Sequence, residues 1–438
     1  MSKDSERRSI RRIVTNSASL LSGNIAGALV AFLALSLTGH LLDPTDFGIL
    51  VLVSSYAQIV SRLVGFQSWQ ALIRFGSQAL TDPAQFQYVV TAGLILDGAA
   101  ALGGTILFLA SVPFFAAFYH LTSDMTLLAY GFGLTLLTNL AGMPIGVLRL
   151  FGRFQLLGMQ EFAAALIRLF LLAASLALPV SVTSIGIIWI VSLTAGQMLL
   201  LYLGIREMRA NKIRFCRTAA AADFLRSNPQ IVRFFLISNL DATIRVLRDA
   251  DILIVGALLS PGAAGFYRIA RQLGALVSRP ADAMHAALYP ELVKQIQLRA
   301  KTLVISTLVR CSSYAAAIGV AACAIFVVTG QEALRVFLGA HYAPAYVICL
   351  FVLASNLIWA MGHPLAPAML ALEQQKQAVT IHLVATAIYL PAVAFLTHEF
   401  GLNGAGVAQV GFIALWTGLS TVSVWRALSQ MSASAKLN

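Results

Sequence analysis

The sequence has few charged residues. Only 11% of its 438 residues are Asp, Glu, Lys or Arg, and 59% are hydrophobic, whereas about a quarter of a typical soluble domain is charged. The mean hydropathy is +0.82. This composition excludes an ordinary soluble domain and predicts a polytopic membrane protein.

Cysteine is scarce, and the common catalytic signatures are missing. The four cysteines, Cys216, Cys311, Cys323 and Cys349, are scattered and show no CxxC spacing, which argues against a zinc site or a disulfide framework. The sequence has no GxxxxGK[ST] loop for nucleotide phosphates, no HExxH and no GxSxG. We therefore expect no metal, no cofactor and no enzymatic activity.

Long apolar runs are abundant instead. About 20 apolar residues cross the ~30 Å hydrocarbon layer, and the backbone of such a segment must satisfy its own hydrogen bonds, so each run is expected to be a helix. Pro, Gly and charge clusters divide the chain into twelve spans, near residues 14–40, 46–66, 86–110, 125–147, 155–178, 184–205, 231–258, 265–288, 302–328, 343–370, 377–397 and 403–427.

The net charge of +12 follows membrane topology and does not indicate a nucleic-acid partner. If the amino terminus is inside, the tails and alternate loops hold twenty Lys and Arg residues, and the opposite loops hold only Arg335. This asymmetry is the positive-inside rule. Both termini are therefore expected to be cytoplasmic.

The chain contains an internal repeat at about half its length. Residues 39–62 and 256–279 agree at eight of 24 positions, including Pro44 with Pro261. Six predicted spans separate the copies, so they should have the same orientation. We expect two parallel six-helix lobes around a central cavity, with lobes at 1–205 and 231–438 and a cytoplasmic linker at 206–230.

Two of the predicted spans carry unusual charge. The seventh places five charged residues on or beside one helical face, and the eighth carries three arginines. Each would cost several kcal/mol facing lipid. The residues are Asp241, Arg245, Arg248, Asp249 and Asp251 in span seven, and Arg268, Arg271 and Arg279 in span eight.

Two interpretations of these charges remain open. One is a structural ion-pair network at i+3 or i+4 spacing, such as Arg248 with Asp251. The other is an anion site, because arginine suits phosphate oxygens in two-point contact and the eighth span has surplus positive charge. Arg62 and Arg279 also fit ordinary snorkelling near the cytoplasmic interface.

Intramembrane acids and helix breaks complete the candidate features. An acid within a span often marks an ion or proton step, so we consider Asp97, Asp249, Asp251 and Glu161 as ion-coupling candidates. Glu161 could equally pair with Arg168 in the same span. "NLIWAMGHPLAP" (356–367) predicts a broken helix in span ten, and "NLAGMPIG" (139–146) is a weaker counterpart in span four.

The residues also carry a family resemblance. "LLDPTDFG" (41–48), which links the first two spans, and "FGLNGAGVAQ" (400–409) before the last span resemble polysaccharide flippases of the O-antigen type, in the multidrug/oligosaccharidyl-lipid/polysaccharide exporter superfamily. The resemblance implies a protein of the bacterial inner membrane that moves undecaprenyl-pyrophosphate-linked oligosaccharide to the outer leaflet. It also implies a basic cavity, carried here by Arg245, Arg248, Arg268, Arg271, Arg279 and Arg62.

Other functions remain as alternatives. A cation-coupled drug exporter of the same superfamily would share the lobes, and a glycan polymerase or ligase would normally need a large outer loop. A major-facilitator carrier would need a basic signature in the expected loop at 67–86, which this sequence lacks. A glycan polymerase and a chain-length regulator are expected partners of a flippase.

Overall fold

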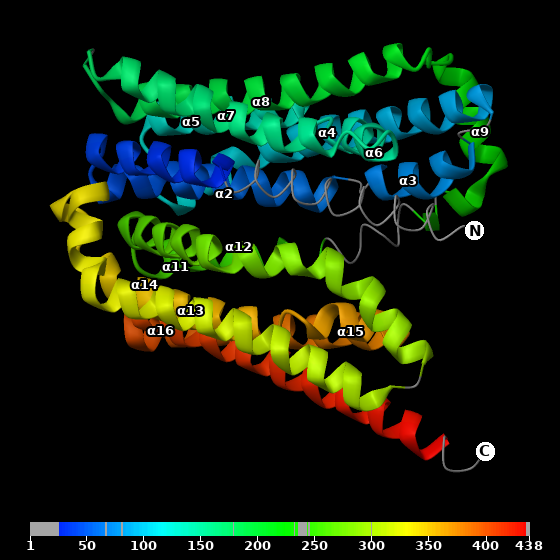
Figure 1. Ribbon diagram of the computed structural model, residues 1–438. Helices are drawn as coiled ribbons and strands as arrows, with labels where there is room; N and C mark the ends of the chain where they lie inside the picture. The colour runs from blue at the N-terminus through cyan, green and yellow to red at the C-terminus, as the bar shows by residue number, and fades with distance from the viewer. Residues whose placement is uncertain are drawn as a thin grey trace. The chain divides into compact units, whose positions relative to one another are not determined.

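The computed structural model describes residues 26–65, 68–79, 82–177, 179–231, 233–234, 243, 246–298 and 300–434 (Figure 1). These residues form two compact units. The first comprises Met1–Leu42 and Ile49–Ala250, and the second comprises Asp43–Gly48 and Asp251–Asn438. The lobe and linker limits expected from the sequence stay a prediction.

The first unit is built from helices that Figure 1 colours from blue to green. It begins with the helix Ala26–Leu41. The elements that follow are α2 (Pro44–Val64), α3 (Ser68–Ala79), α4 (Pro83–Phe118), α5 (Ser123–Thr135), the 3-10 turn η1 (Leu136–Thr138), α6 (Gly142–Leu150), α7 (Phe154–Ser175), α8 (Val182–Ala210), α9 (Thr218–Ser227) and the 3-10 turn η2 (Arg248–Ala250). The first residues of α2, up to Gly48, belong to the second unit.

The second unit is also helical. Its central helix α14 packs against α12, α13 and α16, and α11 packs against α12 and α16. The elements are α11 (Asp251–Leu258), α12 (Pro261–Gln297), α13 (Lys301–Leu338), the 3-10 turn η3 (Ala340–Tyr342), α14 (Ala345–Gly362), α15 (Leu365–Ala371) and α16 (Gln375–Ser434).

The prediction of an all-α polytopic membrane protein is confirmed. Among the described residues, eight helices are long and apolar enough to cross a membrane, and Ala26–Leu41 is a shorter apolar helix. Large apolar side chains such as Phe114 on α4 and Val328 on α13 are 78% and 83% exposed, as lipid contact requires. The count of twelve spans stays a prediction.

Proline and glycine interrupt the helices where the sequence predicts. In span ten, α14 ends at Gly362 and α15 begins at Leu365, on either side of Pro364, which cannot donate a helical hydrogen bond. The hydroxyl of Ser312 donates to the Met361 carbonyl at 2.7 Å, so this carbonyl is satisfied beside the break. Gly401, with φ 61°, separates the two halves of α16, which correspond to the last two predicted spans.

The two halves are broken at different positions. Pro44 and Pro261, which match in the repeat, are each the first residue of a helix, where the missing N–H costs nothing. In span four the break lies between Thr138 and Gly142, whereas the residue that matches Pro364 is Val147, inside α6. The repeat therefore conserves helix starts but not helix breaks.

Residues 67–86 do not form the loop expected from the sequence, because α3 occupies most of this stretch. Its apolar side, which includes Leu72, joins a buried cluster with Val90 of α4, Met143 of α6 and Met208 of α8. An amphipathic helix of this kind is stabilised by packing on the bundle. Its apolar positions, spaced three to four apart, were the signal in the sequence.

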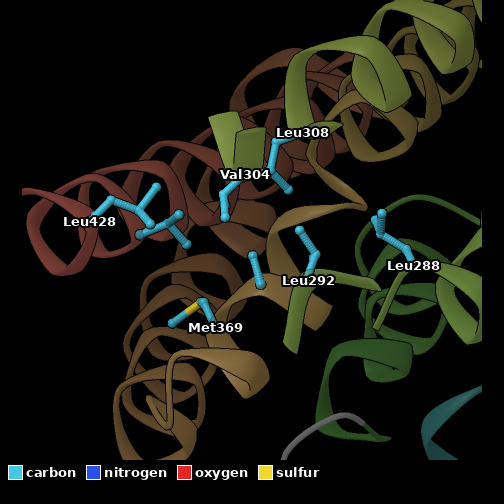
Figure 2. Close-up of a cluster of buried hydrophobic side chains, with 8 residues drawn as sticks. Leu288, Leu292, Val304, Leu308, Met369 and Leu428 are labelled. Carbon is cyan, nitrogen blue, oxygen red and sulfur yellow. The ribbon is translucent and has the colours of Figure 1, made fainter. Parts of the chain in front are cut away.

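One end of the second unit has a separate apolar core. Figure 2 shows Leu288 and Leu292 of α12 near Val304 and Leu308 of α13, with Met369 of α15 and Leu428 of α16. These side chains are at most 9% exposed. They fix the ends of four helices within this unit, because burying each one contributes roughly 1.5–3 kcal/mol.

Candidate functional site

Asp97 lies on α4 and caps the helix that restarts after the break in span four. Its Oδ2 atom accepts a hydrogen bond from the backbone N–H of Met143 at 2.8 Å, in the first turn of α6. A carboxylate stabilises a helix amino terminus because the first N–H groups lack partners within the helix and carry the positive end of its dipole. The helix after the break is thus held by a carboxyl group buried in the first unit.

Gly142 makes this cap sterically demanding. A Cβ atom added there would lie 2.7 and 2.8 Å from the two Asp97 carboxylate oxygens and 1.7 Å from Ser68 Oγ. We expect Gly142→Ala to lower the free energy of unfolding by about 1–3 kcal/mol, the usual cost of overpacking a buried site. Thermal unfolding of the purified protein in detergent measures the change.

Gly98→Ala is the matched control for this substitution. Gly98 follows Asp97 on the same helix, and a Cβ added there would meet nothing within 4 Å. Alanine is also the better helix former, so the control should be as stable as the original protein or slightly more so. Equal stability of the two variants would contradict the role of the cap.

A cavity of about 180 Å³ lies beside the break in span four, entirely within the first unit. Polar side chains, a tryptophan and several small residues share its walls. The lining residues are Ser61, Arg62, Gly65, Trp69, Asp97, Ala100, Ala101, Gly104, Leu136, Asn139, Ala141, Gly142 and Ile145.

Arg62, on the wall of this cavity, binds an acid far away in the sequence. Its Nη1 atom donates to Oδ2 of Asp249 at 3.1 Å. The two side chains are 56% and 26% exposed, and pairs this exposed contribute only about 0–1 kcal/mol to stability. The pair therefore keeps the Arg62 guanidinium at the cavity, and separating the two side chains costs little free energy.

Asp251 in the second unit is held more firmly. Its Oδ1 atom accepts from Arg271 Nη1 at 2.7 Å, and its Oδ2 atom accepts from the hydroxyls of Tyr389 at 2.7 Å and Tyr267 at 2.9 Å. The Asp251 side chain is 2% exposed, and that of Arg271 is 21% exposed. Gln409 Oε1 lies 3.0 Å from the Tyr267 hydroxyl, so the network joins α11, α12 and both halves of α16.

The pairing of Arg248 with Asp251 that helical spacing suggests is wrong. Asp251 pairs with Arg271, twenty residues further along the chain. The i+3 rule requires a continuous α-helix through both residues, whereas Arg248–Ala250 is a 3-10 turn and α11 begins at Asp251. The turn changes the angular spacing, and α12 supplies the nearer cation.

Glu161 and Arg168 line a second cavity of the first unit, of about 270 Å³, with Gln160, Ser192 and Gln197. Nε of Arg168 donates to the Ser192 hydroxyl at 3.0 Å, and its guanidinium lies 5.1 Å from the centroid of the Trp189 ring. Arg168 extends from α7, and these two residues of α8 hold its side chain in position. Its role with Glu161 stays a prediction.

The structure describes the side chains of some of the remaining predicted arginines but not of others. Arg248 lies in η2, and Arg268 lies on α12 one turn before Arg271; both side chains are half-buried. Arg245, like Asp241, lies outside the described residues, and the side chain of Arg279 also lies outside them. The structure therefore describes four of the six predicted phosphate-binding arginines.

Several polar and aromatic residues of these sites were missed in the sequence. Tyr267, Tyr389 and Gln409 surround Asp251, and Trp69 and Asn139 line the first cavity. At the offset of the repeat, 217 residues, Asn139 matches Asn356, and this match is a signal for Asn139 in the sequence. The sequence contains no such signal for the three residues around Asp251, because single polar residues are common in apolar helices and their partners are distant in the sequence.

The chain is similar to known proteins in both sequence and fold. A family model described as "Polysaccharide biosynthesis protein" matches residues 13–295. The chain belongs to the polysaccharide biosynthesis protein family. The matched residues include α2, α4, α11 and most of α12. These helices carry Arg62, Asp97, Asp251 and Arg271. A curated relative, inner membrane protein YghQ of Escherichia coli (strain K12), is 28% identical over 342 residues, which are 77% of this chain and 95% of that protein.

Solved structures share the fold of this family member. Lipid II flippase MurJ in an inward closed conformation aligns with a TM-score of 0.73 at 9% identity, covering 97% of this chain and 91% of that one. An inward-facing multidrug resistance MATE family transporter of the MOP superfamily aligns with a TM-score of 0.63 at 13% identity, covering 97% and 95%. The fold is therefore that of the superfamily named from the sequence, and the chain is a multi-pass membrane protein.

Proposed function

We propose that this protein is a flippase for lipid-linked oligosaccharide, an undecaprenyl-pyrophosphate glycan, which it moves from the inner to the outer leaflet by alternating access. The observation that carries the proposal is a group of arginines on α2, η2 and α12, within the part of the chain that matches the polysaccharide biosynthesis protein family. These arginines are Arg62 on α2, Arg248 in η2, and Arg268 and Arg271 on α12. Arg62 pairs with Asp249, and Arg271 pairs with Asp251.

The chemistry of the arginine side chain fits a pyrophosphate. Charge-assisted hydrogen bonds between guanidinium groups and phosphate oxygens are strong, particularly where water is scarce. Arginine presents a planar fork of donors to phosphate oxygens. The prenyl chain can remain in lipid while the polar head group crosses.

The membrane potential can favour the outward step. An anion leaving a negative interior gains roughly 2.3 kcal/mol per charge per 100 mV, so two phosphate charges provide a substantial driving force. Asp97 and Asp251 already accept hydrogen bonds from N–H, guanidinium or hydroxyl donors. Because the potential alone can favour export, we propose that a proton or sodium step through Asp97, Asp249 or Asp251 can accompany transport but is not obligatory, in a protein with both termini in the cytoplasm.

Removing the arginines tests the function. We expect Arg248→Ala and Arg268→Ala each to reduce flipping roughly 10- to 100-fold, because a hydrogen bond to a charged group contributes about 1.5–3 kcal/mol. Transport is measured with fluorescent lipid-linked oligosaccharide in proteoliposomes and by lectin staining of glycan on a complemented deletion strain. Arg335→Ala is the control, since Arg335 pairs with Glu332 one turn away at an exposed helix end.

The competing functions give different results in the same strain. Normal glycan display by the Arg248→Ala, Arg268→Ala double variant would rule out the role of these residues. Toxin efflux with unchanged glycan would indicate a drug exporter. Unpolymerised glycan that already lies outside the membrane would indicate a polymerase, which we propose as a partner of this protein together with a chain-length regulator.

A further inference from the structure

The cavity beside the break in span four has the size of one small ring. Its volume is about 180 Å³, and an apolar cavity of about 150 Å³ in another protein binds benzene. A six-membered ring with a few substituents therefore fits this space. The rest of a larger substrate would lie outside it.

The walls favour a polar ring over an apolar one. Asn139 Nδ2 donates to the Ser61 hydroxyl at 2.6 Å. In the part of the chain that the structure describes, this contact leaves the Ser61 O–H as a donor and the Asn139 side-chain oxygen as an acceptor. An apolar ligand would bury both groups without partners, at a cost of about 1–3 kcal/mol each. A hydroxylated ring would pair with them.

The remaining walls suit the carbon face of such a ring. Ala100, Ala101 and Gly104 present little side-chain volume along α4, and Trp69 of α3 contributes an indole. The Arg149 guanidinium lies 4.2 Å from the centroid of the Trp69 ring and holds this side chain in place. Polar groups on one side and apolar surface on the other match the two sides of a pyranose.

The cavity lies next to an arginine that we propose binds pyrophosphate. Arg62 follows Ser61 on α2 and lines the same cavity, and it is one of the arginines proposed to bind pyrophosphate. In a lipid-linked glycan, the first sugar is bonded directly to the pyrophosphate. A phosphate held by Arg62 would therefore place that sugar at this cavity.

We propose that this cavity of the first unit binds a single pyranose ring, the sugar next to the pyrophosphate of the lipid-linked glycan. Ser61 and Asn139 bind its hydroxyl or amide substituents, and Trp69 with the small residues of α4 packs against its carbon face. The proposal rests on the proposed flippase function and adds a sugar subsite to it.

Filling the cavity without changing its charge tests the proposal. The protein in nanodiscs is titrated with undecaprenyl pyrophosphate and with three lipids in which it carries one hexose, one N-acetylhexosamine or one deoxyhexose. We expect at least one sugar-bearing lipid to bind about tenfold more tightly than the sugar-free lipid, the gain from two net hydrogen bonds. Ala100→Leu should abolish this preference and keep the affinity for the sugar-free lipid.

Ala110→Leu is the matched control, because Ala110 lies on the same helix with an exposed side chain and should keep the preference. If Ala100→Leu is not recovered as a folded protein, Asn139→Ala should reduce the preference by removing one polar partner. Equal affinity of the original protein for all four lipids, or a preference that survives in the folded variants, would overturn the sugar subsite alone. Failure of every lipid to bind would overturn the flippase function as well.

Discussion

Asp251→Ala is expected to lower the free energy of unfolding by about 3–5 kcal/mol, the cost of removing one partner from a buried ion pair. The substitution removes the buried carboxylate to which the Arg271 guanidinium and two tyrosine hydroxyls are hydrogen-bonded. Thermal and denaturant unfolding in detergent would report the loss. Asp124→Ala, in an exposed first turn of α5, is the control and should change stability by no more than about 0.5 kcal/mol.

A double substitution separates the structural role of Arg271 from a role in binding. Replacing a buried ion pair with apolar residues of similar volume is often neutral, so Asp251→Leu with Arg271→Met should recover most of the stability. If Arg271 also binds pyrophosphate, this stable double variant should still flip lipid-linked glycan roughly 10- to 100-fold more slowly. Full transport by the double variant would make Arg271 a structural residue only.

The architecture was accessible from the sequence because its signals are local. Apolar runs mark the helices, and Pro364 and Gly401 mark interruptions that the structure confirms. Local chemistry suffices here, since a residue without an N–H, or one that adopts positive φ at low cost, affects the backbone at its own position.

The partners of the charged residues were not accessible in this way. Asp97 caps a helix that begins 45 residues later, and Arg62 pairs with an acid 187 residues away. Spacing rules describe contacts between residues of one helix. Charged side chains in a membrane also pair with residues of neighbouring helices, because a charge that faces such a partner costs less free energy than a charge that faces lipid. The sequence therefore identified the acids and arginines but not the pairs.

Asp249→Asn is expected to strengthen binding of the lipid pyrophosphate, whereas Arg62→Ala should weaken it. In the present pair the Asp249 carboxylate and a phosphate would compete for the same guanidinium, and the exposed pair costs little to separate. Removing the negative charge should raise the affinity for undecaprenyl pyrophosphate a few-fold, with an effect that shrinks as salt increases. Arg62→Ala should lower it roughly 10- to 100-fold, and Arg62→Lys should restore part of the loss, because lysine keeps the charge but not the two-point contact. Titrations in nanodiscs at two salt concentrations give all three affinities, and an Asp249→Asn protein that binds more weakly than the original would show that the pair organises the site and does not compete with the substrate.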